Sequence, residues 1–293
     1  MTEREQTLTY DHPVRMIRVA VTVGLVGVLA SCSISAAHDE STPPTADATP
    51  QPIAQNKVKA HTIRHGPRSV KRVAITLDAD YSPSAAERVG NGTYPRQVNT
   101  AAIKFLEESK TPATIFVTGM WAQKYEGDLR RLARNPMFEL GNHTWNHDAW
   151  TKTCYGLPYI RTDEDKREGL RRTNQIVNAV TGKSLQYARL PGLCHNKSDE
   201  QLIAGESLQS VDTDVSTTDA FATNPASVAA GMLKQVKPGS ILLMHLNGAP
   251  NAPATAEILR MLVAGLRTKG LEPVTLETLL RMNGAAMVKE GNL

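Results

Sequence analysis

From residue 71 onward, short apolar strands alternate with amphipathic helices, and this alternation restricts the fold more than any other feature of the sequence. Residues 73–77 and 113–117 have the apolar character of buried strands, and residues 97–109 between them have the spacing of an amphipathic helix. Further strands are predicted at residues 187–190, 208–211, 241–244 and 271–274, and further helices at residues 129–134, 163–180, 225–235 and 255–268. Such regular alternation predicts an α/β fold whose parallel sheet is closed, or nearly closed, into a (β/α) barrel.

The domain organisation follows from length and charge. The chain of 293 residues shows no internal repeat, so we expect one domain over residues 69–283 and a short tail over residues 284–293. The formal net charge is +4, but basic and acidic residues are interleaved and no basic stripe with stacking aromatics is present. The composition therefore argues against a nucleic-acid partner, and we expect a monomer.

The N-terminus has the pattern of an export signal. Arg15 and Arg18 precede an uncharged run over residues 19–30, which is too short for a permanent membrane span. The run ends in Leu29-Ala30-Ser31-Cys32, which resembles the bacterial lipobox, where the cysteine is lipidated and the peptide is cut before it. The alternative is a chance cysteine at an ordinary cleavage site. Residues 1–31 are thus predicted to be a lipoprotein signal peptide.

Residues 32–68 are rich in Ser, Thr, Pro and Ala without hydrophobic periodicity, and they predict a disordered tether. Together with a lipidated Cys32, this tether predicts an exported protein anchored by lipid alone to the extracellular face of a bacterial membrane. Because the segment before Met16 is long and polar for a signal peptide, translation from Met1 and from Met16 both remain open.

Two further cysteines, Cys154 and Cys194, remain if Cys32 carries lipid. In an oxidising compartment a disulfide between them is the economical prediction. Two independent free thiols are the alternative.

A histidine pair is the first candidate for a functional site. His143 and His147 follow a predicted strand over residues 137–140. Histidines four apart fall on one side of a helical turn, so both imidazoles can point at one divalent metal ion. The alternative is a buried structural histidine followed by a surface one.

Three other predicted strand ends carry chemically useful residues. Asp78 and Asp80 project to the same face of an extended segment, so one can bind metal while the other moves protons. Arg189 precedes a Pro-Gly turn and can orient a carboxylate, and His245 ends an apolar strand with a group that titrates near neutral pH. Taken separately, the aspartates are equally typical of a turn, Arg189 of a surface arginine and His245 of a structural histidine.

Taken in order, these segments resemble the five motifs of the NodB-homology polysaccharide deacetylases, carbohydrate esterase family four. The segments are Thr76-Leu77-Asp78-Ala79-Asp80, His143-Thr144-Trp145-Asn146-His147, Arg189-Leu190-Pro191-Gly192, Val211-Asp212-Thr213-Asp214 and Leu242-Leu243-Met244-His245. The resemblance covers about residues 69–280. It implies a distorted (β/α) barrel and a divalent metal, most often zinc, held by an aspartate and two histidines.

The resemblance also implies roles for individual residues. The metal ligands would be Asp80, His143 and His147, and the catalytic base, its orienting arginine and the catalytic acid would be Asp78, Arg189 and His245. Asp212 or Asp214 would fix the histidine or the arginine in place. The family's first motif has two adjacent aspartates, whereas Ala79 separates them here, so whether Asp78 or Asp80 binds the metal stays open.

The implied activity is a metal-dependent hydrolase that removes N-acetyl groups from peptidoglycan or an exopolysaccharide. Gly192 stands where many members have an aromatic residue, and the fourth motif lacks its usual tryptophan, so substrate preference can differ. Two alternatives remain: an esterase that removes O-acetyl groups from a glycan, and a glycan-binding lipoprotein without turnover.

Overall fold

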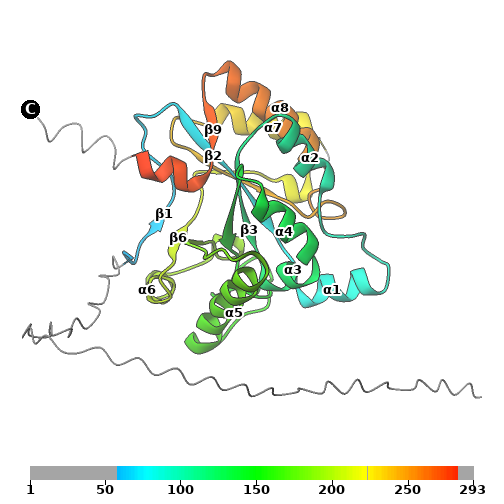
Figure 1. Cartoon of the computed structure of the whole chain (residues 1–293), viewed down its shortest axis with the longest axis vertical. Coiled ribbons are helices and arrows are strands. Elements are labelled where there is room, and N and C mark those ends of the chain that lie inside the picture. The colour runs from blue at the N-terminus through cyan, green and yellow to red at the C-terminus, as the bar shows by residue number, and fades with distance from the viewer. Residues whose placement is uncertain (1–57, 223, 283–293) are drawn as a thin grey trace, which may run out of the picture. The chain divides into compact units, whose positions relative to one another are not determined.

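The computed structural model describes residues 58–222 and 224–282, which form a curled sheet surrounded by helices (Figure 1). The strands are β1 (Thr62–Ile63), β2 (Arg72–Ala79), β3 (Ala113–Val117), β4 (Phe138–Asn142), β5 (Tyr187–Ala188), β6 (Gln209–Val211), β7 (Val215–Ser216), β8 (Ile241–His245) and β9 (Glu272–Val274). The helices are α1 (Pro83–Gly90), α2 (Thr100–Glu108), α3 (Gly119–Lys124), α4 (Glu126–Arg134), α5 (Asp163–Thr181), α6 (Lys197–Gly205), α7 (Pro225–Gln235) and α8 (Thr255–Thr268), with short 3-10 turns η1 (Pro191–Leu193) and η2 (Asp219–Phe221).

All strand pairs of this sheet are parallel. The order is β1-β6-β5-β4-β3-β2-β8-β7, and β9 pairs with the first residues of β2. Only residues 212–214 separate β6, near one end of this order, from β7 at the other end. The sheet therefore curls until its two ends approach, and the predicted distorted (β/α) barrel is confirmed.

The middle of the sheet is buried on both faces. Val73, Ala74, Ile75 and Leu77 of β2 are fully buried, as expected for a parallel strand covered by helices. In Figure 1, α2, α7 and α8 gather on one side of β2, whereas α3, α4 and α5 pack together on the other. This arrangement leaves the carboxyl ends of the strands as the place where polar side chains can meet.

The sequence predicted the long elements well and the short ones poorly. The predicted bounds of β3, α7 and α8 agree with the structure, and α5 extends one residue further. Helices α1, α3 and α6 were not predicted. The tether was predicted to extend to residue 68, but Thr62 and Ile63 form β1 and pair with Ser210 and Val211 of β6. That end of the prediction is wrong, because a two-residue strand leaves no hydrophobic periodicity to detect.

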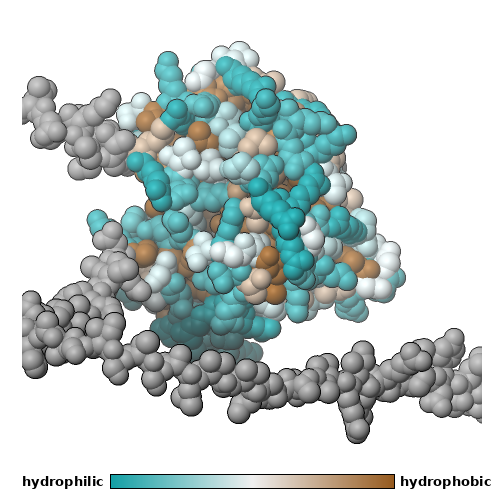
Figure 2. Space-filling model, viewed as in Figure 1, coloured by the Kyte–Doolittle hydropathy of each residue, from teal (hydrophilic) through white to brown (hydrophobic). Residues whose placement is uncertain are grey.

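Several predictions fall outside the described residues. These are the signal peptide (residues 1–31), the lipidation of Cys32, the alternative starts Met1 and Met16, most of the tether, and the tail over residues 284–293. Within residues 58–222 and 224–282, no helix is both long and apolar enough to cross a bilayer. The face drawn in Figure 2 is mainly hydrophilic, with hydrophobic residues scattered in small groups.

Candidate functional site

The predicted site residues meet at the carboxyl ends of the strands. Asp78 lies near the end of β2 and Asp80 directly follows that strand, while His245 ends the neighbouring strand β8. His143 directly follows β4, and Arg189 directly follows β5. Because these strands are parallel and their sheet is curled, the five side chains converge from four strands.

Asp80, His143 and His147 form a compact cluster. The Nε2 atoms of His143 and His147 lie 3.3 and 3.5 Å from Oδ1 of Asp80. One ligand atom from each residue lies within 4.8 Å of the other two. The donor set of one carboxylate oxygen and two imidazole nitrogens is that of a catalytic zinc site, which keeps a position open for water or substrate.

The hydrogen bonds around this cluster favour a cation at its centre. Nδ1 of His143 lies 2.8 Å from the backbone carbonyl of Arg189, so Nδ1 carries the proton and donates it to that oxygen. The lone pair of Nε2 then faces Asp80, whose buried Oδ1 has no hydrogen-bond partner. A proton on Nε2 or a metal ion between these two atoms would relieve their repulsion. A divalent metal fits this arrangement, and the bond from Nδ1 to a carbonyl is typical of a metal-binding histidine.

The electrostatics of the cluster are dominated by burial and by the close charges. Burial raises the pKa of Asp80, but His147, His143 and His245 outweigh it and leave the pKa below its ordinary value. Burial opposes protonation of His143, yet the carboxylates of Asp78 and Asp80 raise its pKa. Burial lowers the pKa of His147. Of the two histidines of the cluster, His143 therefore protonates more readily than His147, and a metal ion that binds there must displace such a proton.

The loop after β4 that carries both histidines is not a helical turn, so that prediction is wrong. Thr144 and His147 have φ values of 64°, in the left-handed region. Two backbone hydrogen bonds of 2.9 Å tie this loop to the start of α3. The N–H of Gly119 donates to the carbonyl of Thr144, and the N–H of Met120 donates to the carbonyl of Trp145. A Cβ atom on Gly119 would lie 2.1 Å from the Trp145 ring, so only glycine allows this contact. The histidines converge because α3 holds the loop.

Asp80 faces the two histidines although Ala79 separates it from Asp78. Ala79 is fully buried in the core between β2 and its covering helices, which leaves Asp78 and Asp80 on the opposite face. The side chain of Asn247 accepts a hydrogen bond from the N–H of Asp80 over 3.2 Å and donates to its carbonyl. Asn247 follows β8 and was not predicted, because nothing in its local sequence shows that it contacts β2.

Asp78 is held by Arg189 in a buried ion pair. Nη1 of Arg189 donates to Oδ1 of Asp78 over 2.8 Å and to the hydroxyl of Thr76 over 2.7 Å. The guanidinium lies 4.2 Å from the ring centroid of Phe116 and is completely buried. The other oxygen of Asp78 lies 3.7 Å from Nε2 of His143, at the edge of the metal cluster. The two aspartates therefore differ: Asp78 is bonded to a cationic side chain, whereas Asp80 faces the two histidines.

Comparison with known proteins gives a family for this geometry. The family model described as polysaccharide deacetylase matches residues 57–205. The chain belongs to the polysaccharide deacetylase family. A curated relative, the peptidoglycan-N-acetylglucosamine deacetylase of Bacillus cereus, is 22% identical over 220 residues, which are 74% of this chain and 70% of the relative.

Solved structures of deacetylase-family proteins have the same fold. The Bc1960 peptidoglycan N-acetylglucosamine deacetylase has a TM-score of 0.64 at 22% identity and covers 75% of this chain and 92% of its own. Bacillus subtilis PdaA, a family 4 carbohydrate esterase, has a TM-score of 0.61 at 20% identity, over 75% and 85% of the two chains. BA3943 of Bacillus anthracis, described as a pseudoenzyme of the CE4 family, has a TM-score of 0.60 at 18% identity, over 76% and 69%.

Within this deacetylase fold, an aspartate that was not predicted holds the catalytic-acid candidate His245. Nδ1 of His245 donates to Oδ1 of Asp219 over 2.8 Å, and the backbone N–H of His245 donates to Oδ2 over 2.7 Å. Burial would lower the pKa of His245, but the bond to Asp219 and the charge of Asp80 raise it to about 9. The imidazole is thus held protonated, and its Nε2 lies 4.0 Å from Oδ2 of Asp80.

The two aspartates predicted to fix the histidine or the arginine, Asp212 and Asp214, do not hold His245. Asp214 accepts hydrogen bonds from Arg68, from Ser240 and from the N–H of Ile241, so it fastens β7 to β8. Asp212 reaches Arg189 only through its backbone carbonyl, which accepts from Nη2 over 3.3 Å. Asp212 therefore helps to hold Arg189, as one form of the prediction had it, but through its backbone, whereas Asp214 bonds neither Arg189 nor His245. Asp219 was missed because its segment, Thr217-Thr218-Asp219-Ala220, has no local feature that sets it apart from a turn.

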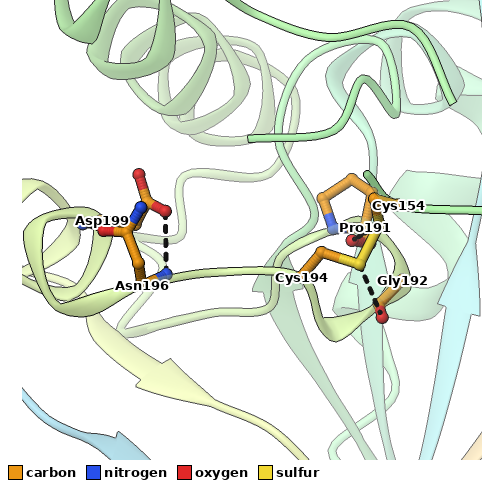
Figure 3. Close-up of a disulfide and its surroundings, with 6 residues drawn as sticks. All are labelled: Cys154, Pro191, Gly192, Cys194, Asn196 and Asp199. Atoms are coloured by element: carbon orange, nitrogen blue, oxygen red, sulfur yellow. Dashed lines mark hydrogen bonds between the residues drawn. A yellow bond between two sulfur atoms is a disulfide. The ribbon is translucent and has the colours of Figure 1, made fainter. Parts of the chain in front are cut away.

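The two cysteines predicted to pair form a disulfide in the structure. It joins Cys154, in the loop after β4, to Cys194, in the loop after β5, across a sequence separation of 40. Figure 3 shows the two sulfur atoms against the turn formed by Pro191 and Gly192. The disulfide therefore links the loop that continues from the histidine pair to the turn that continues from Arg189.

Proposed function

We propose that this protein is a metal-dependent hydrolase that removes N-acetyl groups from an extracellular glycan. One observation carries the proposal: the cluster of Asp80, His143 and His147 lies between an arginine-bound carboxylate, Asp78, and an aspartate-bound histidine, His245. These are the parts that amide hydrolysis needs, namely a cation site, a base and an acid.

Asp80, His143 and His147 would hold the metal. A divalent ion bound there, with zinc the best match to the ligands, would supply Lewis-acid chemistry, namely a lower pKa for a water molecule and a polarised substrate carbonyl. Asp78 accepts the proton of that water. Arg189 fixes the orientation of Asp78 through the hydrogen bond from Nη1 to Oδ1, and Asp78 supplies the counter-charge of the buried guanidinium.

His245 supplies the proton for the departing nitrogen. Its pKa of about 9 keeps the ring protonated at neutral pH, and the hydrogen bond from Nδ1 to Asp219 leaves Nε2 directed at Asp80. The amide bond breaks, water supplies the carboxyl oxygen, and the products are acetate and a glucosamine unit.

Peptidoglycan is the substrate we favour. The curated relative and a similar solved structure are both described as peptidoglycan N-acetylglucosamine deacetylases, and a lipid anchor at Cys32 would hold this domain outside the membrane beside that polymer. We further propose an extracellular, membrane-anchored monomer. An exopolysaccharide is the second substrate, because the same chemistry serves any N-acetylated sugar.

Ala79 in the first motif favours one alternative, a glycan-binding protein without turnover. The structural similarity to BA3943, a pseudoenzyme, makes this alternative concrete. It predicts a poorly retained metal and no effect of Asp78→Asn. An O-acetyl esterase would use the same groups, and parallel assays on O-acetylated and N-acetylated glycans separate it from a deacetylase.

The decisive experiment measures acetate release and bound zinc for the wild-type protein, Asp78→Asn and Asp80→Asn. Wild-type protein should bind about one equivalent of zinc, lose activity on chelation and regain it with zinc. Asp80→Asn should lose both zinc and activity. Asp78→Asn should keep zinc while turnover falls by about 10²- to 10⁴-fold.

The reverse result, with zinc lost only in Asp78→Asn, would exchange the two roles. Zinc binding without acetate release from any glycan would exclude the deacetylase.

A further inference from the structure

An exposed tyrosine lies beside the proposed active site. Tyr155 is 87% exposed, and Met261 is the other exposed large hydrophobic residue in the described part of the chain. An aromatic ring that stays in water contributes little burial to folding, so its face is available to contact a ligand. Tyr155 follows Cys154 directly, and the disulfide to Cys194 therefore restrains its backbone.

The ring of Tyr155 rests by one edge on Gly192. A Cβ atom on Gly192 would lie 2.6 Å from Sγ of Cys154 and 2.9 Å from Cδ2 of Tyr155. Glycine is thus required for the two loops to touch, and it also has a φ of +62°. Figure 3 shows the disulfide on this turn, where Sγ of Cys154 is 3.5 Å from the carbonyl oxygen of Pro191. The edge of the ring is supported while most of its surface remains open.

The supported ring lies close to the catalytic groups. Gly192 is three residues after Arg189, so their Cα atoms are at most about 11 Å apart. Arg189 binds Asp78 with its side chain and His143 with its carbonyl. The loops that carry Tyr155 and Gly192 leave the carboxyl ends of β4 and β5, the same end of the barrel as the site. Tyr155 therefore lies at the same end of the barrel as the site, against the turn that continues from Arg189.

The surroundings of Tyr155 suit a sugar ring. A depression of about 560 Å³ is lined by Lys152, Thr153, Cys154, Tyr155, Gly156 and Cys194. A pyranose has an apolar C–H face that packs on an aromatic ring, and hydroxyl groups at its edge that bond to polar side chains such as those of Lys152 and Thr153.

We propose that Tyr155 is a stacking platform for a sugar unit adjacent to the one that is deacetylated, and that the Cys154–Cys194 disulfide fixes this platform over Gly192. The identity of the ligand rests on the proposed function. The platform itself is a binding site, and it can be tested without turnover.

The test compares wild-type protein with Tyr155→Ala, Tyr155→Phe and Met261→Ala, by calorimetric titration with N-acetylglucosamine monomer and tetramer. Because Tyr155 is exposed, its substitution should not affect folding. Tyr155→Ala should weaken tetramer binding by about three- to tenfold, the effect of one aromatic contact. Tyr155→Phe keeps the ring and should bind the tetramer like wild type, as should Met261→Ala on the distant helix α8. Binding of the monomer should not change.

The kinetic result should match the binding result. Tyr155→Ala should raise KM for the tetramer by the same factor with kcat retained, since the ring holds substrate and transition state equally. Equal tetramer affinity in wild type and Tyr155→Ala, or no tetramer binding by wild type, would overturn the platform. Tetramer binding that depends on Tyr155 with no acetate release would instead overturn the proposed function and leave the platform standing.

The disulfide is tested by a mutant cycle. The double variant Cys154→Ala/Cys194→Ala should lose tetramer affinity to the same extent as Tyr155→Ala, and adding Tyr155→Ala to it should cause little further loss. Fully additive losses would show that the disulfide does not position the ring.

Discussion

Two histidine–aspartate pairs lie at the same end of the barrel and have different surroundings. In His245–Asp219 the ring nitrogen and carboxylate oxygen are 2.8 Å apart, and in His195–Asp212 they are 3.1 Å apart. The aspartate raises the histidine pKa in both pairs. An aspartate partner by itself therefore does not distinguish a catalytic histidine from a structural one.

The second ring nitrogen makes the difference. Nε2 of His245 is directed at Asp80, and its side chain is 20% exposed. Nδ1 of His195 is directed at Glu200, 3.7 Å away, and its side chain is only 7% exposed. Glu200 also accepts a hydrogen bond from Thr62 of β1. The first histidine can reach a substrate, whereas the second joins the loop after β5 to α6 and the N-terminal strand.

The largest difference between the pairs should appear when each histidine is removed. His245→Ala should lower turnover by about 10²- to 10⁴-fold with bound zinc retained, because the proton donor is lost and the metal ligands are not. His195→Ala should keep turnover near wild type and lower the free energy of unfolding by about 1–3 kcal/mol. Acetate release, zinc content and urea unfolding measure these effects. Equal losses of turnover in both variants would contradict the distinction.

A smaller effect is expected from the aspartates. Asp219→Asn should lower kcat by about 10- to 100-fold, the usual effect of removing a partner that orients a functional histidine. His245 must be protonated to act, and Asp219 raises its pKa. Its loss should therefore move the alkaline limb of the pH–rate profile to lower pH.

Asp212→Asn is the matched control for that limb, since its carboxylate contacts His195 and not His245. An alkaline limb that stays in place in Asp219→Asn, or one that moves equally in Asp212→Asn, would remove Asp219 from its supporting role.

The smallest effect concerns stability and pH. The hydrogen bond to Asp212 raises the pKa of His195 above its ordinary value, against the effect of burial. The stability from this pair is therefore fully present below the pKa of an unfolded histidine and is lost as pH rises through the higher folded pKa. The difference in unfolding free energy between wild type and Asp212→Asn should shrink over that range, by at most about 1.4 kcal/mol per pH unit, the slope for one proton. Urea unfolding at a series of pH values measures it, and a constant difference would contradict the prediction.

Site residues at strand ends could be predicted from the sequence, whereas site residues in irregular segments could not. Asp78, His143, Arg189 and His245 each lie within three residues of the end of a predicted strand, and such positions are recognisable from the chain alone. Asp219 and Asn247 support the site from irregular segments after β7 and β8. No periodicity marks such residues, because their role consists of contacts with distant parts of the chain.

The sequence alone determined the parallel α/β barrel, the strand ends that carry the site and the residue types for metal and proton chemistry, because hydrophobic period and chain order are local properties. Only the tertiary structure decided the different surroundings of Asp78 and Asp80, the aspartate that holds His245 and the contact of Tyr155 with Gly192. Each of these depends on which side chains meet across the barrel. These contacts depend on the curvature of the sheet and on loop conformations with positive φ. Residues far apart in the sequence determine both.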